Sequence, residues 1–181
     1  MTKVIVVLAD GFEEMEAVSP IDLLRRAGAS VTVVGLDKKE ITSSRGLKVV
    51  CDTVLSEVAE TGWNAVVLPG GQPGANNLHT SEKVSTIVMN TYNDGGYVCA
   101  ICASPAVVLA PLGLLTGKKA VCYPGMEQGI ENVKFSSGPV MNDARIITAR
   151  GAGCATEFGL EIVSALFSRE IADDLAFKIV Y

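Results

Sequence analysis

The sequence predicts an α/β fold, a flavodoxin-like three-layer sandwich in which helices cover both faces of a mostly parallel central sheet. Short apolar runs rich in β-branched residues alternate along the chain with longer segments of helical periodicity. This alternation is typical of βαβ units, because parallel strands need a crossover connection. The 181 residues, 49% of them apolar, contain no linker-like tract, internal repeat or low-complexity segment. We therefore expect one domain over residues 1–181.

The first half of the chain is expected to supply three core strands. Residues 3–9 form a nearly continuous β-branched run, typical of a strand buried on both faces. Residues 13–27 have helical periodicity, with Gly28 where a C-terminal cap belongs. The apolar positions that share one face of this helix are Ala17, Val18, Ile21 and Leu24. The other expected elements are a strand over 31–36, a hairpin over 40–51, a helical turn over 56–60 and a strand over 65–68.

The second half continues the alternation. Ser81 is an expected N-cap, and Gly95 and Gly96 end the helix that it begins. A strand over 97–101 ends at Cys102, and a buried helical segment over 103–109 follows it. The remaining expected elements are a strand over 119–122, a turn at Asn142-Asp143, a strand over 145–149, and two helices marked by Phe158 to Leu166 and Ile171 to Ile179.

Composition limits the expected partners. The formal charge is −5, from 15 basic and 20 acidic residues, and the basic residues are scattered, which argues against a nucleic-acid partner. No apolar run approaches the roughly 20 residues that span a membrane. The chain enters a strand directly after Met1-Thr2-Lys3, which leaves no room for a signal peptide. We read the five cysteines as free thiols and expect a cytoplasmic location.

Cys102 is the leading candidate for a reactive residue. It lies where a strand turns into a helix N-terminus, and Pro105 occupies a tolerated first-turn position. Free backbone N–H groups and the helix dipole favour the thiolate there. The serine elbow of α/β hydrolases uses the same geometry, although its flanking glycines are missing here. The alternative is a buried cysteine that packs as a small hydrophobe.

Several polar or flexible residues follow the ends of the predicted strands. In open α/β sheets the ligand site lies beyond the carboxyl ends of the strands. We therefore expect these residues to meet at one edge of the sheet. They are the acidic loop Asp10–Glu16, the turn Gly70-Gly71, Cys102, Tyr123 and the pair Arg150-Gly151.

The charges constrain how an acid and Cys102 can cooperate. An ionised carboxylate beside the thiol raises the thiol pKa, whereas a protonated one can donate a hydrogen bond to the thiolate. We therefore expect a neutral glutamic acid whose pKa burial has raised. Gly70 and Gly71 lack Cβ atoms and could bring backbone N–H groups close to the sulfur, although a simple turn explains them equally well.

Four segments together resemble the ThiJ/PfpI superfamily, in its DJ-1-like branch. They are Ala9–Gly28 with Glu13-Glu14-Met15-Glu16, Val66–Gly71, Ala100–Ala103, and Arg150-Gly151 running into Glu157-Phe158. The resemblance implies that Cys102 is an oxidisable nucleophile and that Glu16 hydrogen-bonds it. It also implies that the amides of Gly70, Gly71 and Ala103 surround the sulfur, with Tyr123, Arg150 and Gly151 as possible walls of the site.

The resemblance also implies a homodimer, formed through the first helix and the hairpin. The matching interface residues are Met15, Arg25, Arg26 and Cys51, and Arg45 is expected to approach the partner's site. No cofactor or metal is implied.

The implied activities fall into two classes, each centred on the cysteine. One is glyoxalase or deglycase chemistry on methylglyoxal-like carbonyls, and the other is oxidant sensing through a sulfinate, with chaperone-like protection. A binding or chaperone module with an incidental cysteine is a third hypothesis. Many members place a histidine beside the thiol where this chain has Tyr123, so we do not expect protease activity. The single histidine, His79, is expected at the surface.

Three further motifs do not support other functions. Cys99 and Cys102 have C-x-x-C spacing, but an extended strand places them roughly 10 Å apart on opposite faces. Gly151–Thr156 lacks the third glycine and the following βαβ unit of a dinucleotide site. Pro69–Gly74 lacks the Lys-Ser/Thr pair of a P-loop.

Overall fold

Strand β1 (Lys3–Leu8) lies near the middle of the sheet. In the computed structural model, which describes residues 1–181, the side chains of β1 alternate between two cores. Val4, Val6 and Leu8 enter one core, whereas Ile5 and Val7 enter the other. The continuous β-branched run is thus explained by burial on both faces, as expected.

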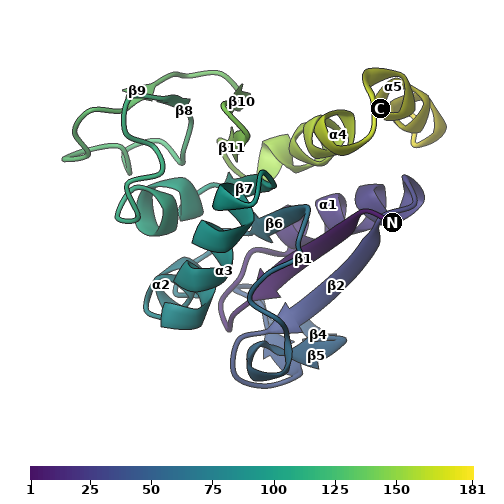
Figure 1. Ribbon diagram of the computed structural model, residues 1–181, viewed down its shortest axis with the longest axis horizontal. Helices are drawn as coiled ribbons and strands as arrows, with labels where there is room; N and C mark the ends of the chain where they lie inside the picture. Colours follow the sequence, from purple (N-terminus) through teal and green to yellow (C-terminus); the bar gives the residue numbers. More distant parts are fainter.

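Seven strands form the central sheet, in the order β10-β11-β7-β6-β1-β2-β5. Six of them run parallel, and only the edge strand β10 is antiparallel to its neighbour β11. Helices flank both faces (Figure 1), so the predicted fold class is confirmed. The bounds of the strands besides β1 are β2 Ser30–Gly35, β5 Thr53–Val54, β6 Ala65–Leu68, β7 Tyr97–Ile101, β10 Val140–Asp143 and β11 Ile146–Ala149.

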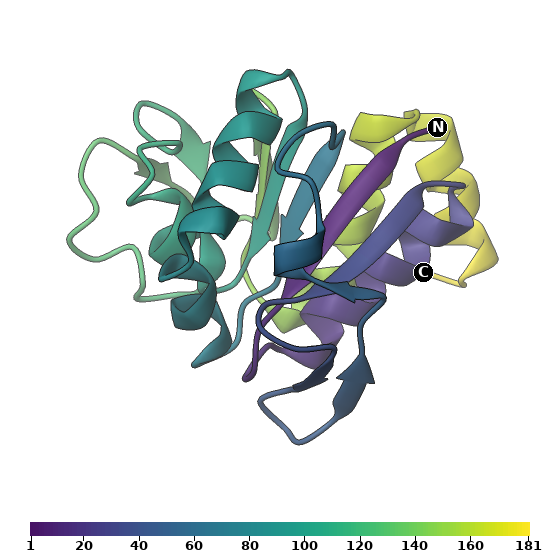
Figure 2. The ribbon, with the colours of Figure 1, turned by 60° about the horizontal axis from the view of Figure 1, so that its bottom comes forward.

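Two helical layers cover the sheet, as Figure 2 shows in a second view. One core holds buried side chains of α1 (Glu14–Arg26), α4 (Ala155–Leu166) and α5 (Arg169–Lys178). The other holds side chains of α2 (Gly74–His79), α3 (Glu82–Asn93) and a short π-helix, η2 (Pro105–Leu109). Two short 3₁₀ turns complete the helical elements, η1 Leu55–Glu57 and η3 Ala152–Cys154.

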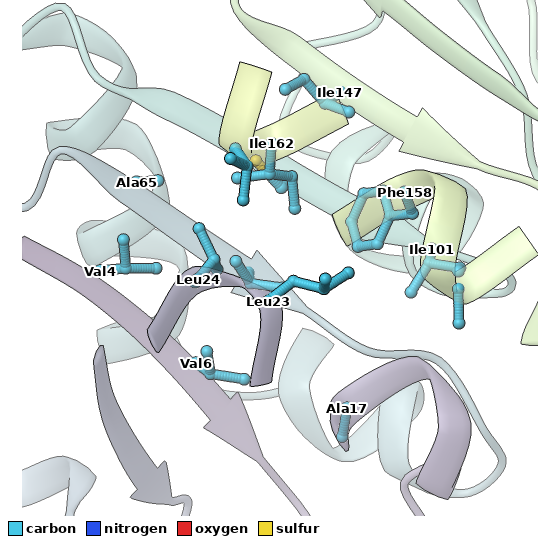
Figure 3. Packing of buried hydrophobic residues seen from close by; sticks show 14 of the residues in the cluster. Val4, Val6, Ala17, Leu23, Leu24, Ala65, Ile101, Ile147, Phe158 and Ile162 are labelled. Atoms are coloured by element: carbon cyan, nitrogen blue, oxygen red, sulfur yellow. The ribbon is translucent and has the colours of Figure 1, made fainter. Parts of the chain in front are cut away.

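The first core brings α1 and α4 into close contact. Leu23 and Leu24 of α1 lie beside Phe158 and Ile162 of α4 over the sheet (Figure 3). A Cβ atom at Gly159 would stand 2.6 Å from Cδ1 of Leu23, so a glycine permits this approach. Burying each large apolar side chain stabilises the fold by about 1.5–3 kcal/mol, and this packing holds α1 against α4 and the sheet.

Several helix ends match their expected caps. The Ser81 hydroxyl accepts a hydrogen bond from the Val84 N–H at 3.3 Å, and α3 ends before Gly95. Gly28 has a left-handed φ of 87°, just beyond the end of α1. No helix is both long and apolar enough to cross a bilayer.

The hairpin β3 (Glu40–Thr42) and β4 (Lys48–Val50) is confirmed, but the strand expected over 119–122 is not part of the central sheet. Its observed part, β8 (Lys119–Ala120), pairs with β9 (Lys134–Phe135) in a separate two-stranded sheet. The Val121 N–H instead bonds the Thr148 hydroxyl, at 3.0 Å. Short apolar runs do not reveal which sheet they join.

Other details also differ from expectation. The turn before β11 lies at Ala144 and Arg145, which both have left-handed φ, while Asn142 and Asp143 belong to β10. Val18 is 48% exposed and lies outside the buried face of α1. The segment after Cys102 is a π-helix, and α2 and the edge strands β5 and β10 were not expected. These are short or marginal elements whose packing partners are distant in sequence.

Candidate functional site

Cys102 occupies a tight turn at the carboxyl end of β7. Its φ of 64° is left-handed, which is uncommon for a residue with a side chain. The turn is held by the Cys102 N–H, which donates to the Ala149 carbonyl at 2.9 Å, and by the Cys102 carbonyl, which accepts from the Tyr123 N–H at 2.7 Å. Two residues further on, the buried Ser104 hydroxyl donates to the Pro69 carbonyl at 2.6 Å. The elbow is therefore formed without flanking glycines, as the strand–helix junction suggested.

Glu16 is buried beside Cys102. Its side chain is only 1% exposed, although it lies in the first turn of α1. Its Oε2 accepts a hydrogen bond from the Gly70 N–H at 2.9 Å, while Oε1 is buried without a well-aligned partner. Burial raises the pKa of Glu16 to about 7, and the nearby Cys102 thiol and the Gly70 and Ala152 amides partly oppose the rise. Burial thus shifts the pKa of Glu16 in the direction expected for a neutral acid.

The neighbouring acids have other partners. Glu13 caps α1, because its carboxylate accepts from the Glu16 N–H at 2.8 Å. Glu14 accepts from the Ser43 hydroxyl and from the Arg45 N–H. Asp10 forms an ion pair with Lys38 at 2.8 Å. The cap thus turns Glu16 inward, and only tertiary contacts distinguish it from the other acids of the loop.

The glycine turn after β6 leaves no room for side chains. A Cβ at Gly70 would lie 2.7 Å from both the Cys102 Cβ and the Glu16 Oε2. Gly71 has a φ of 88°, and a Cβ there would lie 2.5 Å from the Glu13 N. The Gly70 N–H is committed to Glu16, so the amides that hydrogen-bond the sulfur are those of Gly71 and Ala103. The expectation that Gly70 also serves the sulfur is wrong in this respect.

The pKa of Cys102 differs from the sequence-based expectation. Burial raises it to about 12, and the charge and hydrogen bond of an ionised Glu16 add to the rise, against the amides of Gly71 and Ala103. The two groups titrate as a pair. When Glu16 is neutral its charge is absent, and its O–H can donate to the sulfur. The thiolate therefore belongs to the state in which Glu16 holds the proton.

The Cys102 side chain opens onto a pocket of about 450 Å³. Tyr123, 52% exposed, forms one wall, and its Cδ2 is 3.6 Å from the position of a Cβ on Gly151. The lining residues are Gly71, Gln72, Cys102, Ala103, Tyr123, Pro124, Gly125 and Met126. Arg150 is not among them: its Nη1 donates to the Ser137 carbonyl at 3.2 Å, and it lines a neighbouring pocket with Cys122. The structure does not bring Arg150 to the thiol.

The residues expected at a dimer interface lie on α1 and the hairpin, and all of them except Cys51 are accessible. Met15 is 55% exposed, and the hairpin is tied to α1 through the Arg45 N–H, 3.0 Å from a Glu14 oxygen. Arg25 pairs with Asp52 at 3.3 Å, and Arg26 pairs with Asp22 at 2.6 Å. Cys51 is only 3% exposed and packs in the first core, so it offers little contact surface.

The remaining thiols and the histidine are separate from Glu16. Cys99 is fully buried, and all five cysteines are free. Cys122 lies 3.8 Å from a Glu127 oxygen, and Cys154 belongs to η3. His79, at the end of α2, is exposed. No three His, Cys, Asp or Glu side chains cluster in a metal-binding arrangement. Nothing in the sequence indicated that the Ala152 amide lies beside Glu16, because this contact depends on how η3 packs.

Comparisons with known proteins match this geometry over most of the chain. The family model described as the DJ-1/PfpI family matches residues 2–165. Protein dj-1beta of Drosophila melanogaster is 40% identical over 175 residues, which cover 95% of this chain and 93% of the relative. Protein DJ-1 homolog B of Arabidopsis thaliana is 41% identical over 169 residues, or 93% of this chain, but this chain spans only 39% of its length.

Solved structures agree with these relatives. Oxidized DJ-1 of Toxoplasma gondii has a TM-score of 0.96 at 38% identity, over 100% of this chain and 99% of that one. A cysteine-to-alanine mutant of a DJ-1 superfamily protein of Salmonella typhimurium has a TM-score of 0.95 at 32% identity, over 100% and 99%.

Proposed function

The chain belongs to the DJ-1/PfpI family, and on that premise we propose that it is a DJ-1-like stress-response protein whose reactive group is Cys102. The observation that carries the proposal is the buried Glu16, whose pKa of about 7 lets one carboxyl proton serve the adjacent sulfur. The amides of Gly71 and Ala103 supply fixed donors on the sulfur. No other cysteine of the chain combines an elbow, a buried acid and an open pocket.

Oxidant sensing is the first role of this site. The thiolate attacks one peroxide oxygen to give a sulfenate and water, and a second peroxide gives the sulfinate and a second water. The neutral Glu16 O–H donates to the new oxygen, and the Gly71 and Ala103 amides can bind the other. The site thereby stabilises a charged oxidised state that an apolar pocket alone would disfavour.

Glyoxalase or deglycase chemistry on methylglyoxal-like carbonyls is the second role. The sulfur adds to the aldehyde carbon, and the carbonyl electron pair moves to the oxygen, which takes the Glu16 proton. The proton on the aldehyde carbon then moves to the ketone carbon, and the new hydroxyl proton moves to the ketone oxygen, which gives a thioester. Water hydrolyses the thioester to the hydroxy acid and the free thiol, whose proton returns to the Glu16 carboxylate. One carbon is oxidised while the next is reduced, so the conversion requires no cofactor. Tyr123 is not a histidine-type general base, so we do not propose protease activity.

A pH titration of alkylation tests the activated thiol. We expect the iodoacetamide rate of Cys102, followed by peptide mapping, to rise with an apparent pKa well below the model thiol value of about 8.5. Glu16→Gln should move this midpoint upward, because the amide cannot exchange a proton with the sulfur. Cys154 in the same sample is the internal control. A wild-type midpoint at or above the model value would refute the activation.

Two assays separate the roles. The enzyme predicts that methylglyoxal is consumed without glutathione, that Cys102→Ala abolishes consumption and that Cys154→Ala retains it. The sensor predicts that mild peroxide adds two oxygens at Cys102 before any other cysteine. A protein that shows neither effect, yet suppresses the aggregation of a client protein, is the binding or chaperone module.

We also infer a homodimer and a cytoplasmic location. Exposed apolar side chains on α1 and the hairpin support the dimer, since such side chains in one area commonly mark an interface. These are Met15, Val18, Leu47 and Val50. Five free thiols are typical of a reducing compartment.

A further inference from the structure

The pocket at Cys102 has an apolar wall that the proposed chemistry does not use. The side chains of Tyr123, Pro124 and Met126 form this wall, and no charged side chain lines the pocket. Glu16 lies beneath the sulfur and is almost inaccessible, at 1% exposure. A ligand in the pocket thus meets one reactive sulfur, backbone amides, the uncharged Gln72 side chain and apolar surface.

Tyr123 is held in place by its backbone. Its N–H donates to the Cys102 carbonyl at 2.7 Å, so the wall and the nucleophile are coupled by one short hydrogen bond. The ring stands beside Gly151, where a Cβ would lie at ordinary van der Waals distance from it. Half of Tyr123 remains exposed, so a ligand can cover apolar surface that the fold leaves in water.

Within one chain, no cationic side chain lines this pocket. Arg150 is the charged residue that the strand ends would have brought closest, but its guanidinium donates to the Ser137 carbonyl and lines the adjacent pocket. The selectivity that one chain supplies at this pocket therefore comes from its apolar wall.

We propose that Tyr123, Pro124 and Met126 make Cys102 selective for electrophiles with an aryl or other apolar substituent next to the reacting carbon. The favoured substrate class is aryl α-oxoaldehydes, such as phenylglyoxal, over α-oxoaldehydes with a small substituent, such as methylglyoxal. The inference rests on the proposed addition of Cys102 to carbonyl carbon. In that step the S–C bond forms, the carbonyl electron pair moves to oxygen, and Glu16 supplies the proton. Tyr123 contacts the substituent rather than the reacting atoms, and offset stacking of the two rings favours the aryl group.

Alkylating probes test the selectivity without any need for turnover. Second-order rate constants of Cys102 are measured with 2-iodo-N-phenylacetamide and iodoacetamide, and each is divided by the rate constant of glutathione with the same probe. In each reaction the S–C bond forms and iodide leaves. We expect the phenyl probe to gain about tenfold over iodoacetamide, the scale on which apolar pockets discriminate.

Variants of Tyr123 and Met126 test which side chains raise the rate of the phenyl probe over that of iodoacetamide. Tyr123→Ala should bring the phenyl-to-iodoacetamide ratio close to that of glutathione, whereas Tyr123→Phe should retain it because the ring remains. Met126→Ala should lower it by a smaller factor. In a turnover assay, Tyr123→Ala should lower kcat/KM for phenylglyoxal more than for methylglyoxal, chiefly through KM.

The outcomes distinguish this inference from the proposed function. A fast, low-pKa Cys102 with a wild-type ratio equal to that of glutathione overturns the selectivity alone, as does a ratio that Tyr123→Ala leaves unchanged. A Cys102 that reacts with no probe faster than glutathione overturns the activated nucleophile, and the selectivity with it. Circular dichroism spectra that match the wild type confirm that each variant is folded.

Discussion

A nearly inaccessible carboxylic acid affects the stability of the fold as well as the chemistry of its neighbour. Glu16 has one hydrogen-bonded oxygen, Oε2, and one buried oxygen without a well-aligned partner. A protonated carboxyl suits this environment, because it carries no charge to be solvated and its O–H faces a sulfur acceptor. The same proton therefore lowers the cost of burial and serves Cys102.

This arrangement predicts a pH-dependent stability. The pKa of Glu16 rises from 4.5 to about 7 on folding, mainly through burial. Protonated Glu16 therefore contributes its full stabilisation of the folded state below pH 4.5. Between pH 4.5 and about 7 this contribution is lost, because Glu16 ionises in the unfolded chain while it is still protonated in the folded protein. The loss amounts to about 3 kcal/mol. Glu16→Gln should remove this pH dependence. The free energy of unfolding of the variant, measured by urea denaturation, should therefore rise relative to that of the wild type between pH 4.5 and 7.5.

The exposed Glu131→Gln is the matched control, and its difference from the wild type should stay constant over this range. An equally constant difference for Glu16→Gln would show that the carboxyl is ionised in the folded protein across the whole range.

At the scale of elements, the site exists because three parallel neighbours end at one edge. Strand β1 pairs with β6, and β6 pairs with β7, so the loops that follow them are adjacent. These loops supply the start of α1, the glycine turn and the elbow of Cys102. No single loop forms the site, and its precision depends on how closely the three backbones approach.

Gly70→Ala tests this close approach. The new Cβ would stand 2.7 Å from the Cys102 Cβ and from the Glu16 Oε2, so the two reactive groups must separate. We expect the free energy of unfolding to fall by about 1–3 kcal/mol, and the alkylation rate of Cys102 near neutral pH to fall as well.

Gly153→Ala is the control, because a Cβ there meets nothing within 4 Å and the residue has no left-handed φ. It should leave both quantities close to the wild type. A Gly70→Ala variant with an unchanged alkylation midpoint would mean that the glycine turn does not position the pair.

At the scale of the molecule, patterns of local origin could be predicted and long-range ones could not. Lys3–Leu8 and the Ser81 cap follow from periodicity and cap chemistry, and Cys102 follows from the place where a strand ends. The prediction that residues 119–122 form a strand of the central sheet was wrong, because the two paired residues of β8 give no sign of which sheet they join. Glu16 could not be separated from its acidic neighbours without the tertiary contacts that bury it.

The effect of Glu16 on the pKa of Cys102 could not be predicted, for a related reason. The helix N-terminus beside Cys102 was visible in the sequence, but its burial and its coupling to one specific acid were not. Likewise, Val18 fits the apolar periodicity of α1 yet is 48% exposed, because the sheet and α4 cover the other side of the helix. Local periodicity thus does not distinguish a helix face that packs in the core from an apolar face that stays exposed in the single chain.

Val18 belongs to the surface through which we expect two copies to associate. Figure 2 shows the β3–β4 hairpin projecting at the bottom of the molecule, below α1. Hydrogen bonds from the Arg45 and Ser44 N–H groups to Glu14 and Phe12 hold the hairpin against the start of this helix. The hairpin and α1 are therefore joined by hydrogen bonds, and both carry exposed apolar side chains: Met15, Val18, Leu47 and Val50.

Val50→Asp should disrupt the association. Val50 is 75% exposed in the single chain, so the substitution costs the monomer little, whereas a carboxylate buried between two copies would lack a partner. Sedimentation velocity should show the wild type at twice the 19.0 kDa chain mass and the variant shifted towards that of one chain. Phe177→Asp, at an 84% exposed position on α5, is the matched control and should remain dimeric. If Phe177→Asp dissociates the protein and Val50→Asp does not, the interface lies at the C-terminal helix instead of at α1 and the hairpin.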